Sequence, residues 1–261
     1  MYTMGIDIGS TTSKCVILKD GSEIVATSMI AAGTGTDGPQ RAVEAVYRQA
    51  GEILPEQISH ITATGYGRSR FEAANSEVSE LSCHAKGVLL MLPEVRTIID
   101  IGGQDAKVIA IGENGRMVNF LMNDKCAAGT GRFLDVMAGI LQLQIDDLEA
   151  EAAKSQSPVK ISNTCTVFAE SEVISQLASG ANLPDLVAGI CQSVAARVAS
   201  LAKRVGVKEQ VCMSGGVARN GGVRAAMAKE LGVEVRYCPM AQLMGALGAA
   251  IYAYEKASLE K

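Results

Sequence analysis

A short sequence pattern occurs twice in this chain, and this repetition constrains the fold more than any other feature. Residues 5–9 read Gly-Ile-Asp-Ile-Gly and residues 99–103 read Ile-Asp-Ile-Gly-Gly. In both places an apolar, strand-like run ends in an aspartate and a glycine turn, and a return strand with a hairpin glycine follows. A strand ending in a hydroxyl residue and glycine comes later in each half, at residues 61–65 and 210–216. Repeats at this long spacing indicate a duplicated domain and not a solenoid.

The order of strand and helix patterns predicts an α/β fold with two related lobes that face a cleft. We expect the first lobe to span residues 1–93 and the second residues 94–261, with the boundary near Pro93. A chain of 261 residues is long enough for two modest lobes with real cores. Helical patterns are expected at about 39–50, 79–92, 130–140, 167–179, 183–205, 221–231 and 242–255.

The turns after the two aspartates are candidates for phosphate binding. Small hydroxyl residues in a turn between strands offer N–H and O–H donors to phosphate oxygens, and a lysine adds positive charge. In the second half, two glycines allow the backbone to come close to a ligand. These candidate binding residues are Ser10, Thr11, Thr12, Ser13 and Lys14 in the first turn, and Gly102 and Gly103 in the second.

Asp7 and Asp100 stand at the ends of strands in the two lobes, where hard carboxylates suit a hydrated Mg²⁺ that bridges phosphates. Gly215 and Gly216 would let a flat base or a ribose lie against the chain. Gln104, beside the second turn, would either orient an attacking water or cap its own turn.

Composition and motif absences exclude several classes of protein. No G-x-x-x-x-G-K-[ST] string occurs, so the chain has no Walker A loop, and Gly129-Thr-Gly131 lacks the third glycine of a dinucleotide fingerprint. The net charge of −4 argues against a general nucleic-acid binder. No apolar run reaches the ~18 residues of a membrane span, and no signal peptide precedes the first strand pattern. We therefore expect a cytoplasmic protein without a nucleic-acid or membrane partner.

The doubled aspartate and glycine pattern resembles the acetate and sugar kinase, Hsp70 and actin superfamily of ATPases. In that resemblance, residues 5–14 look like the first phosphate segment, residues 99–104 the second, and residues 213–220 the adenosine segment. The resemblance covers nearly the whole chain. It implies two duplicated ribonuclease H-like, actin-like ATPase lobes around a nucleotide cleft. It also implies ATP or ADP as the ligand. With the carboxylate argument above, we expect Mg²⁺ as a cofactor and Asp7, Asp100 and Gln104 as the candidate catalytic residues.

Two of the seven cysteines lie in a distinctive setting. Cys126 and Cys165 each stand in a polar turn of small residues ahead of a helical pattern, whereas Cys15, Cys191 and Cys212 lie in apolar runs. A helix N-terminus favours a thiolate, and thiolates are the ligands of iron–sulfur clusters. The alternative is that both are ordinary buried thiols.

The strings around these cysteines, residues 123–135 and 164–175, are very specific. They resemble the activator component of 2-hydroxyacyl-CoA dehydratases, in the BadF/BadG/BcrA/BcrD-type ATPase family. The resemblance implies a homodimer with one [4Fe–4S] cluster, held by Cys126 and Cys165 from each subunit. It further implies ATP hydrolysis coupled to transfer of one electron into a separate dehydratase component, with a ferredoxin or flavodoxin as the electron donor.

Two further candidate residues have two interpretations each. Asp135 either faces the nucleotide or caps its helix. Gln242, ahead of the last helical pattern, either lines an adenine pocket or lies on the surface.

Other functions on the same fold remain as alternatives. A sugar or acyl-phosphate kinase has a stretch that resembles Asn123-Asp124, but in sugar kinases that stretch looks to precede the second phosphate turn, and here it follows. An Hsp70-like or actin-like binding ATPase would not need Cys126 or Cys165. An ATPase subunit of a benzoyl-CoA-reductase-type enzyme would carry the same motifs and would purify within a larger complex.

Overall fold

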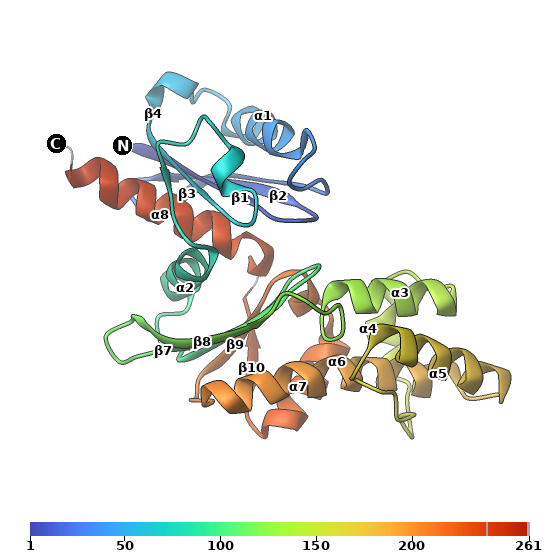
Figure 1. The fold of residues 1–261 in the computed structure, drawn as a ribbon. Coiled ribbons are helices and arrows are strands. Elements are labelled where there is room, and N and C mark those ends of the chain that lie inside the picture. Colours follow the sequence, from blue (N-terminus) through green and yellow to red (C-terminus); the bar gives the residue numbers. More distant parts are fainter. Residues whose placement is uncertain (239, 260–261) are drawn as a thin grey trace. The chain divides into compact units, whose positions relative to one another are not determined.

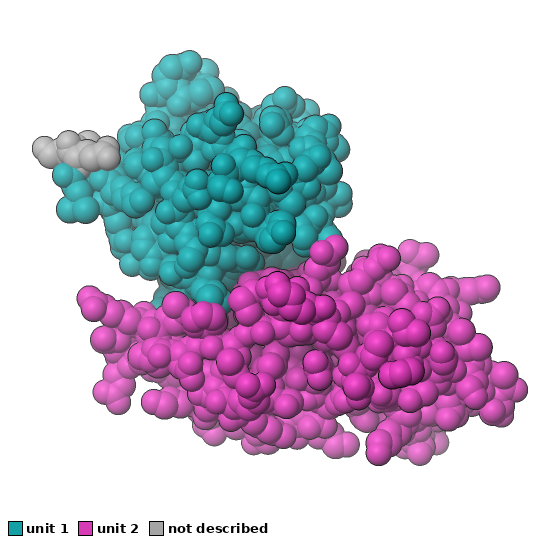
Figure 2. All heavy atoms as spheres, viewed as in Figure 1, with its two compact units in different colours: residues 1–94, 242–261 teal, residues 95–241 magenta. Residues whose placement is uncertain are grey.

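The computed structural model describes residues 1–238 and 240–259, which form two compact units (Figures 1 and 2). Unit 1 contains residues 1–94 and the C-terminal segment from residue 242, and unit 2 contains residues 95–241. Each unit is built on a five-stranded sheet that mixes parallel and antiparallel pairs.

The sheet of unit 1 has the strand order β3-β2-β1-β4-β5. Strands β1, β2 and β3 form an antiparallel meander, and β4 and β5 add in parallel on the other side of β1. The strands are β1 (Tyr2–Ile8), β2 (Ser13–Lys19), β3 (Glu23–Ile30), β4 (Ile58–Thr64) and β5 (Ser76–Glu77).

Side-chain alternation along β1 assigns one helix to each face of this sheet. Met4, Ile6 and Ile8 join the hydrophobic core beneath α1 (Gly38–Ala50). On the opposite face the backbone of α8 (Met244–Leu259) lies where a side chain at residue 5 would stand. Successive strand residues point to opposite faces, so α1 and α8 cover opposite sides (Figure 1). Helix α2 (Glu80–Met91) then packs against α8.

The sheet of unit 2 repeats this arrangement. Its order, β8-β7-β6-β9-β10, has the same antiparallel meander and the same two parallel additions. The strands are β6 (Thr97–Ile101), β7 (Ala106–Ile111), β8 (Met117–Asn123), β9 (Val211–Ser214) and β10 (Val235–Tyr237). The matching topologies confirm the prediction of an α/β fold made of two duplicated lobes.

The helices of unit 2 gather around one long helix, α6 (Leu183–Val205), which contacts β7, β8 and all four other helices. By length and composition α6 would be long enough to cross a membrane, but 67% of its most apolar window is buried in the protein, as in a core helix. The other helices are α3 (Gly131–Leu141), α4 (Asp147–Ala152), α5 (Thr166–Ala178) and α7 (Gly221–Leu231).

The compact units differ from the predicted division of the chain at one segment. The predicted second lobe includes all of residues 94–261, whereas the C-terminal helix α8 belongs to unit 1. The reason lies in packing: α8 contacts β1, β2, β4 and α2, and the Thr3 hydroxyl donates a hydrogen bond to the Ala250 carbonyl oxygen at 3.1 Å. Residue order alone does not reveal that the chain returns to its first sheet.

In each unit, one glycine after a parallel strand lies directly against the buried aspartate. Gly65 follows β4 with a φ of +86°, and Gly215 follows β9 with a φ of +82°. A Cβ atom added at Gly65 would meet Asp7 Oδ1 at 2.5 Å, and one at Gly215 would meet Asp100 Oδ1 at 2.9 Å. Positive φ and this close approach both require glycine.

We predict that Gly65→Ala destabilises the protein more than Gly51→Ala. Both glycines have positive φ, so both substitutions carry a backbone cost of about 1–2 kcal/mol. Only the new Cβ at residue 65 would meet other atoms, because nothing lies within 4 Å of one at residue 51. Overpacking should add about 1–3 kcal/mol to the loss at residue 65. Urea unfolding measures both free energies, and equal losses would contradict the steric explanation.

Candidate functional site

Asp7 lies buried at the end of β1, and its carboxylate is only partly neutralised. Lys14, its cross-strand partner on β2, has Nζ 3.3 Å from Asp7 Oδ2. Within residues 1–238 and 240–259, Asp7 Oδ1 has no hydrogen-bond partner. A buried carboxylate oxygen without a partner is costly and marks a place where a water or an ion binds. The residue therefore fits a hydrated cation.

Asp100 lies at the equivalent end of β6 in a more completely bonded network. Lys107 Nζ is 3.3 Å from Asp100 Oδ2 and 2.6 Å from Asp105 Oδ2, and the Lys107 side chain is only 1% exposed. Ser214 donates a hydrogen bond to Asp100 Oδ1 at 2.9 Å. Sequence reasoning found Lys14 but missed Lys107, although each lysine follows its aspartate by seven positions. The shared spacing was the signal that would have found it.

The two predicted phosphate turns have the same backbone geometry. The Gly9 N–H donates to the Thr12 carbonyl at 2.9 Å, and the Gly102 N–H donates to the Asp105 carbonyl at 2.9 Å. In the first turn Ser10 and Thr11 are exposed and Thr12 is half-buried. The Ser13 hydroxyl differs from these because it donates to the Ala32 carbonyl oxygen at 2.8 Å.

The remaining predicted nucleotide residues lie in several environments. Gln104 is exposed beside half-buried Gly103, and Asp135 is exposed on α3. Gly216 is exposed at the start of a 3₁₀ turn after β9, and Gln242 is half-buried in unit 1 just ahead of α8. Within unit 2 the second predicted phosphate turn lies next to α3, to which it is hydrogen-bonded.

Backbone hydrogen bonds join the second phosphate turn directly to α3. The Gly131 N–H donates to the Gly102 carbonyl at 2.9 Å, and the Arg132 N–H donates to the Gly103 carbonyl at 2.7 Å. The first N–H groups of a helix have no partner inside the helix, so the turn satisfies two of them. The loop that carries Cys126 ends at this junction, since α3 begins at Gly131.

Cys126 and Cys165 both lie on short loops that precede helices. The Asn123 side chain donates to the Cys126 carbonyl at 2.8 Å and to the Ala128 carbonyl at 3.1 Å, which folds the first loop back on itself. Cys165 is the N-cap residue of α5, so it lies directly ahead of a helix, as the sequence predicted. The N-terminal end of a helix carries a partial positive charge, which favours an anionic ligand there.

The seven cysteines divide into two groups by burial. Five are buried, and desolvation raises the pKa of the Cys15, Cys83 and Cys191 thiols to about 12. Cys126 and Cys165 are half-buried. Two accessible sulfur donors on loops of one unit suit a soft metal centre such as an iron–sulfur cluster, which is held by thiolates.

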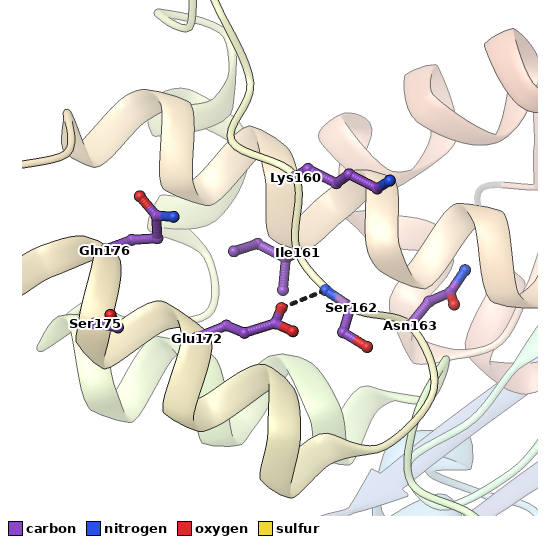
Figure 3. A pocket seen from close by; sticks show the side chains of 7 residues that line it. All are labelled: Lys160, Ile161, Ser162, Asn163, Glu172, Ser175 and Gln176. Carbon is purple, nitrogen blue, oxygen red and sulfur yellow. Dashed lines mark hydrogen bonds between the residues drawn. The ribbon is translucent and has the colours of Figure 1, made fainter.

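A polar pocket of about 520 Å³ lies beside the Cys165 loop, between α5 and the preceding segment (Figure 3). Among its lining residues, Glu172 accepts a hydrogen bond from the Ser162 N–H at 2.7 Å. The lining residues are Lys160, Ile161, Ser162, Asn163, Glu172, Ser175 and Gln176. None of them belongs to the predicted phosphate turns, so this pocket is separate from those segments.

The sequence as a whole matches a known class of nucleotide-hydrolysing proteins. Residues 4–253 match the profile of the BadF/BadG/BcrA/BcrD ATPase family. The chain belongs to this ATPase family, as its motifs predicted.

Two members of the family are similar to this chain over nearly its whole length. The 2-hydroxyisocaproyl-CoA dehydratase activator of Clostridioides difficile is 58% identical over 98% of this chain and 96% of its own length. The (R)-2-hydroxyglutaryl-CoA dehydratase activating ATPase of Acidaminococcus fermentans is 59% identical over 99% of both chains. A solved structure of the C. difficile activator with bound ADPNP matches with a TM-score of 0.96 at 57% identity, covering 100% of this chain and 97% of the other.

The division of the cysteines predicts their reactivity. In iron-free native protein at pH 8, an alkylating reagent should modify Cys126 and Cys165 and spare the five buried cysteines. The thiolate is the reactive form, and at this pH a thiol with a pKa of about 12 is almost entirely protonated. Mass spectrometry of digested protein counts the modified sites, and denatured protein, in which all seven react, is the control. A buried cysteine labelled as fast as Cys165 would refute the assignment.

Proposed function

We propose that this protein is an ATP-hydrolysing activator that delivers a single low-potential electron to a 2-hydroxyacyl-CoA dehydratase. The observation that carries the proposal is the junction at α3, where the predicted phosphate turn at Gly102 and Gly103 is hydrogen-bonded to the first two residues of the helix that follows the Cys126 loop. An ATPase without redox chemistry would not need two accessible cysteines on the loops that precede α3 and α5. The identity of 58–59% to two dehydratase activators supports the same conclusion.

ATP would be bound through its phosphates by the two turns. Ser10, Thr11, Thr12 and Lys14 would serve the first turn, and the N–H groups of Gly102 and Gly103 the second. Ser13 would support its turn through its bond to Ala32 rather than contact phosphate. Gly215, Gly216, Asp135 and Gln242 are the proposed contacts of the nucleoside.

Hydrolysis would use the two aspartates and Gln104. Asp7, whose Oδ1 is unpartnered among the described residues, would accept a hydrogen bond from a water on Mg²⁺. Asp100, already bonded to Lys107 and Ser214, would offer its remaining lone pairs to a second such water. Gln104, exposed beside the second turn, would orient the water that attacks the terminal phosphate, which leaves ADP and inorganic phosphate.

Cys126 and Cys165 would supply two of the four thiolates of a [4Fe–4S] cluster, and a second copy of the chain would supply the other two. Such a cluster, when bound, supplies reversible one-electron chemistry. A homodimer is also supported by Val167 and Phe168, which directly follow the Cys165 loop and are each 64% exposed. Large apolar side chains exposed beside a metal ligand are typical of a surface that a partner covers.

Coupling between the two activities would run through α3. A phosphate that approaches Gly102 and Gly103 changes the surroundings of the carbonyl groups to which α3 is bonded. A shift of α3 would move the Cys126 loop, because only four residues separate Cys126 from the first residue of α3. ATP drives such a change only if it binds the two arrangements with different affinity.

The other proposed partners follow from this role. A reduced ferredoxin or flavodoxin in the cytoplasm would donate the electron, and the dehydratase component would receive it. The acyl-CoA substrate would bind to the dehydratase and not to this chain. No membrane or nucleic acid takes part in this scheme.

An anaerobic reconstitution tests the proposal. This protein is mixed with a 2-hydroxyacyl-CoA dehydratase, a strong reductant and Mg-ATP, and formation of the enoyl-CoA is followed. We expect dehydration only when both ATP and reductant are present, and a loss of at least about 100-fold for Cys165→Ser, because a cluster ligand is removed. Cys191→Ala, a change at a buried cysteine of the same unit, is the matched control and should stay active.

Dehydration that proceeds without ATP, or with Cys165→Ser at the rate of the control, would contradict the proposal. Release of ADP stimulated by a sugar would instead favour a kinase.

A further inference from the structure

One side of α6 lies beneath both cysteine loops. Asp185, Gly189, Ser193 and Arg197 are spaced four residues apart, so they lie along one side of the helix, each about 6 Å beyond the last. We call these four residues the α6 stripe. They contact two segments that are separated in sequence, one leading to Cys165 and one following Cys126.

Asp185 holds the beginning of the segment that leads to Cys165. Its Oδ1 accepts hydrogen bonds from the Ser155 hydroxyl at 2.6 Å and from the N–H groups of Gln156 and Ser157, both at 2.9 Å. Its own carbonyl accepts from the Val159 N–H at 3.0 Å. The bond from Ser155, with the two backbone donors, lowers the pKa of the Asp185 carboxyl below its ordinary value.

Gly189 and Ser193 hold the middle and the end of the same segment. The Val159 carbonyl oxygen occupies the place where a Cβ on Gly189 would stand. Ser193, only 4% exposed, donates its hydroxyl to the Ser162 carbonyl at 2.9 Å. Glu172 accepts from the Ser162 N–H, as Figure 3 shows. Both peptide groups of Ser162 are thus fixed, three residues before Cys165.

Arg197 supports the other cysteine loop. Gly129, three residues after Cys126, lies so close to α6 that an added Cβ would meet Arg197 Cγ at 2.8 Å. Arg197 is one turn beyond Ser193 on the stripe. The two cysteine loops therefore lie on neighbouring turns of one helix.

We propose that the α6 stripe sets the spacing between Cys126 and Cys165, and that Ser193 is the positioning residue for Cys165. Neither loop is regular secondary structure, so each depends on outside contacts for its conformation. Because both loops contact the same helix, their positions relative to each other depend on α6. The role of this spacing rests on the proposed cluster, because a cubane requires its thiolates at fixed positions.

The test compares alkylation rates of Cys165 and Cys126 in the same iron-free protein. In Ser193→Ala we expect the rate at Cys165 to rise roughly fivefold, which corresponds to about 1 kcal/mol, while Cys126 stays unchanged. Ser193→Thr, which keeps a hydroxyl, should restore the rate. Ser258→Ala, which removes a hydroxyl bonded to the Tyr254 carbonyl in unit 1, is the control and should change neither rate.

A second variant pair covers the case in which Ser193→Ala fails to fold. Glu172 is exposed, and Glu172→Ala removes the other bond to Ser162, whereas Glu172→Gln keeps an acceptor oxygen. We expect Glu172→Ala to accelerate Cys165 selectively and Glu172→Gln to do so much less. A Cys165 rate within twofold of wild type in both alanine variants would overturn the inference.

Iron retention separates this inference from the proposed function. After anaerobic reconstitution, Ser193→Ala should release iron to a chelator several-fold faster than Ser258→Ala. If wild type itself binds no iron, the proposed function fails while the alkylation result still stands. If wild type binds iron and Ser193→Ala reacts and retains iron as wild type does, the inference alone fails.

Discussion

Two backbone hydrogen bonds at the start of α3 connect the predicted phosphate turn of unit 2 to the helix that follows the Cys126 loop. They join the carbonyls of Gly102 and Gly103 to the N–H groups of Gly131 and Arg132. Because the first N–H groups of a helix have no partner inside the helix, these two bonds satisfy the N–H groups of Gly131 and Arg132. The turn at Gly102 and Gly103 is therefore connected to the Cys126 loop through the start of α3. In the proposed function, this short link gives nucleotide binding a direct route to a cluster ligand.

The two duplicated lobes differ in the partners of their buried aspartates. Both keep an aspartate at a strand end, a lysine seven residues later and a glycine pressed against the carboxylate. In unit 2, Lys107 is buried between Asp100 and Asp105, and Ser214 completes the network. In unit 1, Asp7 has only Lys14 as an ion-pair partner within the described ranges. The same framework thus offers one tightly held carboxylate and one with an open oxygen.

Much of this architecture was predictable from local sequence signals. Helical patterns placed α2, α6 and α7 within about two residues, and strand-like apolar patterns placed the central strands. The short elements α4, β5 and β10 were missed because so few residues carry no clear period. The membership of α8 in unit 1 and the contacts of Gly189 and Ser193 depend on residues distant in sequence. Ser193 looks like any small residue inside a helix until its partner, Ser162, is known.

Whether two chains share one cluster is tested by measuring iron, sulfide and molecular mass together on anaerobically purified protein. We expect about four irons and four sulfides per dimer in wild type and in Cys191→Ala. Cys126→Ala should lose both iron and sulfide. Iron-free wild type, or a Cys126→Ala protein that keeps its full iron, would rule out the shared cluster and leave a two-lobed ATPase without redox chemistry.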